Sequence, residues 1–322
     1  MRRVSIKEKI MTTIDSFQTK YPTQMGFFYG LLSPFLFNCA NYISRDMSAR
    51  HPPFQIVYMF SFQMFVYNYM LLRLRGIPLV LKGPDANKLS IYRVLLSCFG
   101  CAFLFYAFPL LSYSEGLVIM NIGPVFSGIL AVFFLGEVYD LSLFLNTVIS
   151  LLGVILIAKP VFLFGTTENV LFPQRSLGIL FILICTITGS FGTIIMKKLS
   201  GKAEAPVMAA WFGFSLSACF GILQIFSGIH SLTLKEYLLL IINGTLEASG
   251  QLIIGQAYKY GKATTISMLG YSRILYAYMT EIFMDGVIPD NLSIIGSMCI
   301  FSSLFVTIHK LNKAQRASNA KA

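Results

Sequence analysis

Residues 114–135 (SEGLVIMNIGPVFSGILAVFFL) decide the class of the fold. This stretch of 22 residues has one charged side chain, Glu115, near its start. An α-helix of about 20 apolar residues crosses the roughly 30 Å hydrocarbon core of a bilayer. We therefore predict that this stretch forms a membrane-spanning helix. Gly123 and Pro124 lie near its middle, where a proline frees a backbone carbonyl and permits a kink.

The rest of the chain repeats this apolar pattern. Of the 322 residues, 56% are hydrophobic and 12% are charged, about half the charge of a soluble domain. This composition excludes a soluble protein, a disordered chain and a secreted disulfide scaffold. The apolar runs are continuous, which excludes a β-barrel with its period of two. We predict an all-α integral membrane protein with ten transmembrane helices. They cover residues 25–45, 53–74, 89–111, 114–135, 140–160, 176–198, 206–228, 234–257, 262–284 and 289–309.

The basic residues predict the orientation of these helices. On the ten-span arrangement, 19 of the 25 Lys and Arg lie on the side of the N-terminus, five lie on the opposite side, and Arg273 lies inside a span. Cytoplasmic loops are enriched in Lys and Arg, so both termini are predicted to be cytoplasmic. Topology and anionic lipid headgroups therefore explain the net charge of +11 without a nucleic-acid partner.

The two halves of the chain align when one is shifted by 150 positions. The dipeptide Gly136-Glu137 then falls on Gly286-Val287, and Asp140 falls on Asp290. Each half holds five spans, and an odd number of spans inverts the second half relative to the first. The predicted organisation is a cytoplasmic segment 1–24, a first repeat 25–160, a non-cytoplasmic linker 161–175, a second repeat 176–309 and a cytoplasmic tail 310–322.

Residues 111–137 (LSYSEGLVIMNIGPVFSGILAVFFLGE) resemble the fourth-span signature of the EamA-type drug/metabolite transporter superfamily, which has a mid-span proline and ends in Leu-Gly-Glu. Residues 152–160 (LGVILIAKP) are similar to the fifth-span ending of that family. Residues 257–265 (AYKYGKATT) and 271–289 resemble its eighth-to-ninth-span stretch. The greatest likeness is to the branch of solute carrier family 35 that is not assigned to nucleotide sugars. Val287 departs from the pattern, which usually has Glu there.

This resemblance implies a carrier of ten helices in two inverted five-helix repeats, with both termini in the cytoplasm. Members of the family move small polar metabolites by alternating access. Their central cavity is lined by spans such as the first, third, fourth, sixth, eighth and ninth.

Two charged side chains lie near the middle of predicted spans. Glu247 is about 13 residues into the span 234–257, and Arg273 is about 11 residues into the span 262–284. A charge at the bilayer centre costs about 2.5–3.5 kcal/mol on insertion scales, so each is a functional-site hypothesis. At a rise of 1.5 Å per residue both lie roughly 16–20 Å from a span end, close enough to pair. We expect Arg273 to bind an anionic substrate and Glu247 to couple protons or gate transport; the alternative is a structural ion pair.

Uncharged polar residues complete the predicted substrate site. Gln251 shares a helix face with Glu247 because it lies four residues later, and Tyr276 lies three residues after Arg273. The remaining candidates are Asn38, Asn41 and Asn121. Such side chains either line a cavity or hold helices together, and the sequence leaves both interpretations open. Structural or gating roles are assigned to Gly123, Pro124, Gly136 and Glu137.

The leading functional hypothesis is a secondary-active transporter of a small polar metabolite, anionic if Arg273 binds it. The chain lacks a G-x-x-x-x-G-K-[ST] loop, so energy would come from gradients or exchange. The alternatives are a nucleotide-sugar transporter or antiporter of an endomembrane, and a non-transporting scaffold or sensor with the same fold.

No catalytic residue, metal or cofactor is expected. The short loops hold no His, Asp or Ser cluster for an enzyme, the six cysteines lie within spans, and the three histidines lie at span ends and form no site. The expected partners are a small-molecule substrate and the lipid bilayer, and a homodimer is left open. The sequence does not distinguish an endomembrane from the plasma membrane.

Overall fold

A computed structural model describes most of the chain. The described residues are 21–48, 50–81, 83–107, 110, 116, 119–138, 140–159, 163, 174–284, 286 and 290–319. The predicted N-terminal segment 1–24 and linker 161–175 lie almost entirely outside these residues, as does the end of the predicted tail 310–322. Within the described residues every long element is an α-helix and no strand occurs.

Each of the ten predicted spans contains a described helix. The helices are α2 (Pro22–Ser48), α3 (Pro53–Arg75), α4 (Pro84–Ala107), α6 (Gly123–Leu135), α7 (Leu141–Ala158), α9 (Arg175–Ser200), α10 (Ala205–Ser227), α11 (Leu234–Tyr260), α12 (Ala263–Leu269), α13 (Ser272–Met284) and α14 (Asn291–Asn319). The predicted span 262–284 is divided into α12 and α13 by a turn at Gly270 and Tyr271. In the predicted span 114–135, a turn at residues 121–122 precedes α6.

The helices differ in how clearly they qualify as membrane spans. Among the described residues, three helices are both long and apolar enough: α9, the stretch Ala205–Phe226 of α10, and α11. Three shorter apolar helices are Gly123–Leu135, Leu141–Ile157 and Asn291–Thr307. The other helices carry polar side chains that the bundle buries, for example Asn38 in α2, Asn68 in α3 and Arg93 in α4. Such residues lower the apolarity of a helix without exposing a polar group to lipid.

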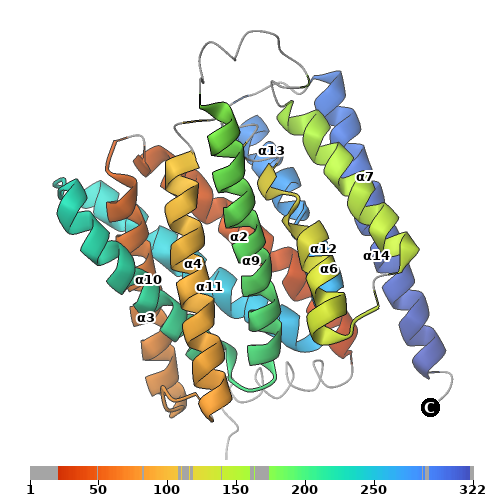
Figure 1. The fold of residues 1–322 in the computed structure, drawn as a ribbon, viewed down its shortest axis with the longest axis horizontal. Helices are drawn as coiled ribbons and strands as arrows, with labels where there is room; N and C mark the ends of the chain where they lie inside the picture. The colour runs from red at the N-terminus through yellow and green to blue at the C-terminus, as the bar shows by residue number, and fades with distance from the viewer. Residues whose placement is uncertain are drawn as a thin grey trace, which may run out of the picture.

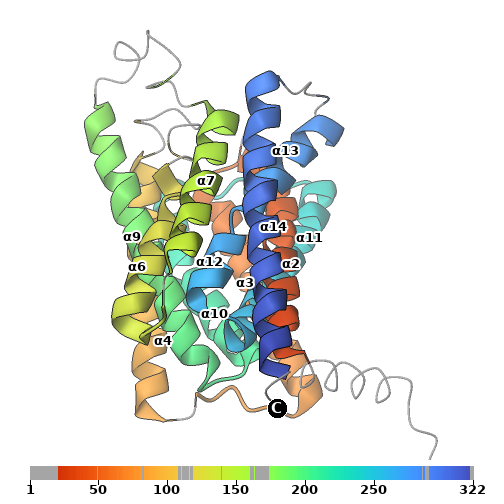
Figure 2. The same ribbon diagram turned by 90° about the vertical axis from the view of Figure 1, so that its right-hand side faces the viewer.

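The helices pack as an upright bundle built from long-range pairs (Figures 1 and 2). The most extensive contacts join α3 to α10, α2 to α11, α4 to α9, and α7 to α14. Each of these pairs joins a helix of the first half of the chain to one of the second half. The beginning of α2 and the end of α14 lie at the same end of the bundle, which we call the terminal end (Figure 1).

The α7–α14 pair packs closely through small residues. A Cβ atom on Gly153 would lie 2.6 Å from the carbonyl oxygen of Gly296, and a Cβ atom on Gly296 would lie 2.6 Å from that of Gly153. Beside this crossing, Ser150 Oγ donates a 2.8 Å hydrogen bond to Ser303 Oγ. The close approach therefore depends on both glycines, as in membrane helix pairs joined by small residues.

Two ion pairs join the ends of α7 and α14. Asp140, the N-cap of α7, accepts a hydrogen bond from Leu143 N and lies 3.4 Å from Lys310 Nζ of α14. Asp290 immediately precedes α14 and lies 2.5 Å from Lys159 Nζ at the end of α7. Each helix thus places a lysine against an aspartate at the start of the other helix, and a carboxylate at a helix N-terminus also suits the helix dipole.

Candidate functional site

One face of α11 carries the polar residues that the sequence singled out. Glu247 and Gln251 are four residues apart, so their side chains leave the helix on the same side. Two glycines flank this face: a Cβ atom on Gly250 would lie 2.7 Å from the Phe37 ring of α2, and one on Gly244 would lie 2.5 Å from Gln63 of α3. Because Glu247 lies between these two contacts around the helix, it faces the interior of the bundle between α2 and α3.

Gln251 binds a buried arginine of α4. Arg93 Nη2 donates a 3.1 Å hydrogen bond to Gln251 Oε1, and the Arg93 guanidinium lies 4.2 Å from the centroid of the Phe212 ring in α10. Arg93 is only 6% exposed. The amide and the aromatic face compensate part of the cost of burying this charge. Arg93 thus joins three helices, α4, α10 and α11.

The burial of Arg93 corrects the sequence analysis. From the sequence, Arg93 is one of the 19 basic residues predicted on the side of the N-terminus, and Arg273 is the one arginine predicted inside a span. The structure begins α4 at Pro84, five residues before the predicted start, so Arg93 lies about 14 Å into the helix. Pro84 was the signal that could have shown this, since proline favours the first turn of a helix.

Glu247 and Arg273 do not form the expected contact. No ion pair within 4.0 Å joins these two described side chains, although they attract each other at longer range. The Glu247 carboxylate is partly exposed and accepts no hydrogen bond from a described residue. Arg273 is exposed, and its side chain likewise makes no hydrogen bond or ion pair to a described residue. Both charges therefore remain available to a ligand.

Arg273 lies where the ninth predicted span is broken. It is the second residue of α13, directly after the turn that separates α12 from α13. Thr280, seven residues later on the same face of α13, accepts a 2.8 Å hydrogen bond from Asn38 Nδ2 of α2. Arg273 therefore projects from the side of α13 that faces α2 rather than from a lipid-facing side, where its charge would be costly.

The polar residues of α2 lie opposite these groups. Besides the bond from Asn38 to Thr280, the Phe35 ring packs edge-on against the Tyr276 ring at 5.4 Å between centroids. Further along α2, Ser44 Oγ accepts a 2.8 Å hydrogen bond from Asn243 Nδ2 of α11. Asn41 lies between the residues that contact α13 and those that contact α11, and it is half-buried. Asn38 and Tyr276 thus hold α13 against α2, and Asn41 faces the same interior region as Glu247.

Glu137 binds the beginning of α12. Its Oε1 accepts a 2.8 Å hydrogen bond from Ala263 N, and its Oε2 accepts bonds from Thr264 N at 3.0 Å and from Thr264 Oγ1 at 2.9 Å. A carboxylate at this position satisfies free amide groups and interacts favourably with the helix dipole. Gly136 ends α6 in the left-handed conformation with φ of 65°, which directs the chain and Glu137 toward α12. The Leu-Gly-Glu motif therefore joins the two broken spans.

Lys197 of α9 holds the other side of this junction, a role the sequence analysis missed. Its Nζ donates to the carbonyl oxygens of Tyr258 at 2.6 Å and Gly261 at 2.7 Å. These carbonyls lie at the end of α11, where a cation satisfies groups that lack a partner in the helix. Lys197 and Glu137 together hold the short turn from α11 to α12 from both sides.

Gly123 and Pro124 begin α6. The proline occupies the first turn of the helix, where its missing N–H costs nothing. Ser190 Oγ of α9 donates a 3.1 Å hydrogen bond to the Gly123 carbonyl oxygen. Asn121 is half-buried in the turn just before α6. Like α13, α6 is therefore a half-helix that begins inside a predicted span.

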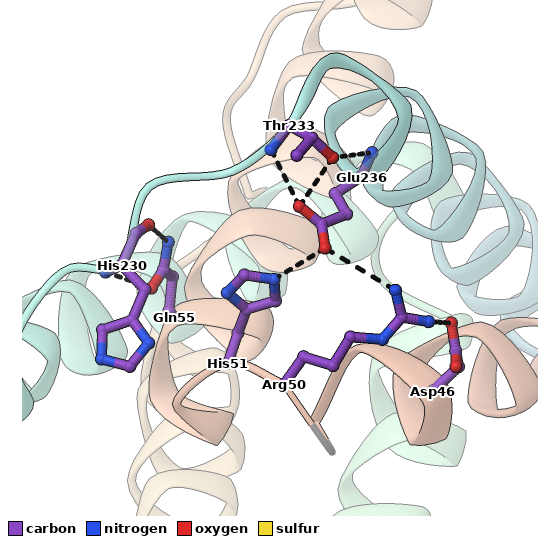
Figure 3. A network of polar contacts seen from close by, with 7 residues as sticks. All are labelled: Asp46, Arg50, His51, Gln55, His230, Thr233 and Glu236. Atoms are coloured by element: carbon purple, nitrogen blue, oxygen red, sulfur yellow. Dashed lines mark hydrogen bonds and ion pairs between the residues drawn. The ribbon is translucent and has the colours of Figure 1, made fainter.

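A separate polar network lies where α2 ends and where α3 and α11 begin, at the end of the bundle opposite the terminal end. Figure 3 shows its side chains. Glu236 of α11 accepts a bond from Thr233 N at 2.8 Å and lies 3.1 Å from His51 Nε2 and 3.8 Å from Arg50 Nη1. Gln55 exchanges two hydrogen bonds with the backbone of His230, at 2.8 and 3.0 Å. His51 and His230 therefore take part in a structural network that joins the α2–α3 turn to the start of α11, and the sequence did not indicate these contacts.

Metal-ligand clusters are absent from the part of the chain that the structure describes: no group of three or more His, Cys, Asp or Glu is arranged to hold a metal ion. Cys98, Cys101 and Cys219 pack with apolar residues in one cluster between α3, α4 and α10. These cysteines therefore pack in the bundle as small apolar side chains do.

Comparison with known proteins gives consistent similarities. A family described as the EamA-like transporter family matches residues 24–159 and again residues 176–309. Solute carrier family 35 member G1 of Mus musculus is 27% identical over 289 residues, which cover 87% of this chain and 77% of that protein. Pseudopaline exporter CntI of Pseudomonas aeruginosa is 21% identical over 278 residues, which cover 85% of this chain and 93% of that protein.

One solved structure, described as a crystal structure of a protein, superimposes with a TM-score of 0.77. The match covers 92% of this chain and 99% of that chain at 15% identity. This likeness supports the fold alone.

Proposed function

The chain belongs to the EamA-like transporter family, and from the placement of its interior charges we propose that it moves a small polar, anionic metabolite by alternating access. Membership confirms the resemblance noted at residues 111–137, and it makes the chain an integral membrane protein with a transporter's fold. The substrate, its charge and the mechanism are our proposal.

The placement of Arg273 carries this proposal. Its guanidinium is exposed and without a partner among the described residues, it faces α2, and it stands in the first turn of α13. A helix that begins inside the membrane points the positive end of its dipole at the same place. A guanidinium and a helix N-terminus together favour a carboxylate or phosphate group. Glu247, within electrostatic range, would bind a cationic group or a proton during the cycle.

We further propose that the two halves are inverted repeats. In support of this, α7 begins at Leu141 and α14 at Asn291, which are 150 residues apart. Gly136 and Gly286, also 150 apart, have φ values of 65° and 68°. The reciprocal ion pairs of Asp140 and Asp290 and the double family match add to this support. The half-helices α6 and α13 would then be equivalent elements of the two repeats.

The termini are proposed to be cytoplasmic. With Arg93 moved to the interior, 18 Lys and Arg remain on the terminal side against five on the opposite side, which is still a strong asymmetry. Labelling of single cysteines introduced at Lys235 and at Lys202 with a membrane-impermeant reagent tests this. Accessibility of the Lys202 position from outside would overturn the assignment.

The transport proposal is tested with purified protein in liposomes. A thermal-shift screen against small metabolites first identifies ligands, since a ligand at 100 times its dissociation constant stabilises by about 2.7 kcal/mol. Uptake of each hit is then measured for the native chain, for Glu247→Gln and for Lys235→Gln, an exposed surface control. We expect uptake by the native chain and the control, and reduced uptake by Glu247→Gln. Binding without uptake would instead favour a sensor, and normal uptake by a Glu247→Gln/Arg273→Gln double variant would overturn the proposed site.

A further inference from the structure

A groove on the side of the bundle lies between α4, α6 and α9. It has a volume of about 580 Å³, and all its lining side chains except Lys198 are apolar or aromatic. In Figure 1, α9 lies between α4 and α6 and contacts both of them. The groove therefore has α9 as its floor and α4 and α6 as its walls.

The walls of the groove face outward. Tyr92, Leu95 and Phe99 of α4 are 57%, 59% and 53% exposed, and Phe134 of α6 is 51% exposed. In an integral membrane protein such side chains contact lipid, because water would make their exposure unfavourable. A hollow of this size needs an occupant, and the surrounding acyl chains are apolar molecules that can fill it.

The groove extends over the depth of one leaflet. Its lining on α4 runs from Leu89 to Phe99, and ten residues of helix correspond to about 15 Å. The hydrocarbon core of a bilayer is about 30 Å thick, so one leaflet contributes about 15 Å. A single acyl chain of a lipid in the leaflet at the terminal end therefore matches the groove in length.

Two lysines stand at the terminal end of the groove. The Nζ of Lys198, in the last turn of α9, lies 5.6 Å from the centroid of the Phe134 ring. Lys88 lies one turn before Tyr92, so it is on the groove face of α4. The start of α4 lies beside the end of α9, because Asp85 in the first turn of α4 is 3.6 Å from Lys202, two residues after α9. Unlike Lys202, neither Lys88 nor Lys198 pairs with a carboxylate of the described residues.

We propose that this groove binds one anionic phospholipid, with an acyl chain along α4 and the headgroup phosphate at Lys88 and Lys198. The apolar walls bind the chain, and the two lysines favour a headgroup with net negative charge over a zwitterionic one. Tyr92 lies one turn from Lys88, near the headgroup end of the groove, where the polar end of an aromatic ring is favourable. This site is independent of the proposed substrate and of the transport direction.

Fluorescence quenching by brominated lipids tests the site, because Trp211 is the chain's one tryptophan. The variant Trp211→Phe/Leu95→Trp carries a reporter in the groove, and Trp211→Phe/Phe305→Trp carries one on the exposed face of α14. Both are placed in nanodiscs of phosphatidylcholine with a minor fraction of brominated phosphatidylserine, or of brominated phosphatidylcholine at the same fraction. We expect brominated phosphatidylserine to quench the tryptophan at position 95 more strongly than brominated phosphatidylcholine does. At position 305 the two lipids should quench the tryptophan equally.

Lysine variants locate the headgroup. Adding Lys88→Gln or Lys198→Gln to the groove reporter is expected to weaken the preference for phosphatidylserine about fivefold for each lysine, whereas Lys235→Gln at the opposite end leaves it unchanged. Size-exclusion chromatography verifies folding, and Phe99→Trp replaces Leu95→Trp if the latter does not fold.

Four outcomes would overturn the proposal. The first is equal quenching by both lipids at position 95, and the second is a preference for phosphatidylserine that persists in the Lys88→Gln/Lys198→Gln variant. The third is loss of this preference when water-soluble glycerophosphoserine is added at equal concentration. The fourth is cross-linking of position 95 to a second copy of the chain. The third would indicate a headgroup site that does not use the groove.

Discussion

The two arginines inside the bundle have opposite surroundings. Arg93 is buried, bonded to Gln251 and covered by Phe212. Arg273 is exposed at a helix break and has no such partner among the described residues. A protein that buries a charge without compensation loses stability, so Arg93 with its partners is well suited to hold helices together. A charge that keeps its hydrogen-bonding capacity free is suited to a ligand. The comparison is the basis on which we propose a structural role for Arg93 and a role in substrate recognition for Arg273.

The largest expected effect is on transport, from Arg273→Gln. Removing a charge-assisted hydrogen bond to the substrate costs about 1.5–3 kcal/mol, which corresponds to a fall in uptake of about 10- to 100-fold. The free energy of unfolding is expected to change by less than about 0.5 kcal/mol, because the side chain is exposed and unpartnered. Uptake into liposomes and denaturant unfolding in detergent measure the two quantities.

Arg273→Lys is the matched variant for this experiment. It keeps the charge but loses the planar fork, so partial recovery of uptake is expected. If Arg273→Gln lowers the free energy of unfolding enough to account for its loss of uptake, the distinction between the two arginines is wrong.

The next effect is on stability, from Gln251→Leu. This change keeps the volume of the side chain but leaves the buried Arg93 guanidinium without its side-chain acceptor, at a cost of about 2 kcal/mol. Adding Arg93→Met should recover most of the loss, because replacing both partners by apolar groups is close to neutral. A double-mutant cycle from denaturant unfolding measures the coupling. Additive effects of the two changes would contradict the proposed structural role of Arg93.

A smaller effect is expected from Glu137→Ala, which removes the hydrogen bonds to Ala263 and Thr264 at the start of α12. The loss of a helix cap costs about 1 kcal/mol. Because α12 leads directly into α13, we also expect a modest fall in uptake through displacement of Arg273. Glu204→Ala, at an N-cap without a side-chain cap bond, is the control and should leave both properties unchanged. If Glu137→Ala is as stable as the native chain, the Leu-Gly-Glu motif does not hold this junction.

The smallest effect is the pH dependence of the α7–α14 pair, which is remote from both arginines. The hydrogen bond from Lys159 and that from Ser293 lower the pKa of Asp290 to about 2. Because the folded-state pKa lies below the usual value of about 3.9, the contribution to stability is present above that value and is lost as the pH falls toward 2. The temperature of thermal unfolding should fall slightly as the pH is lowered between these values. In the Asp290→Asn variant this fall should be smaller. An equal decrease in the two proteins would contradict this role of Asp290.

Most of the helical organisation was predictable because it depends on local properties. Apolar length identified a helix in each predicted span, and the spacing of 150 residues located the matching starts of α7 and α14. Among the described helices, however, only three are both long enough and apolar enough to cross a membrane. The inner helices bury polar side chains within the bundle. Their mean hydropathy is therefore lower than their burial in the protein would suggest.

The candidate site was predictable only in part. Glu247 and Arg273 were visible as charges in apolar stretches, and Gln251 followed from its spacing on the α11 face. Arg93 was missed because its predicted span began too late, and Lys197 because it resembled an ordinary basic residue at a helix end. Both make their contacts with residues at least 60 positions away in the chain.

The family, the set of helices and the small number of charges inside them could all be inferred from the sequence. These follow from apolar length, charge distribution and short motifs, which are properties of neighbouring residues. Which of these charges are compensated depends on how the helices pack. Gln251 reaches Arg93 across 158 residues of chain, while Glu247 and Arg273 stay out of direct contact. Helix packing sets those distances, and the free energy of an interior charge depends on its nearest atoms rather than on its position in the sequence.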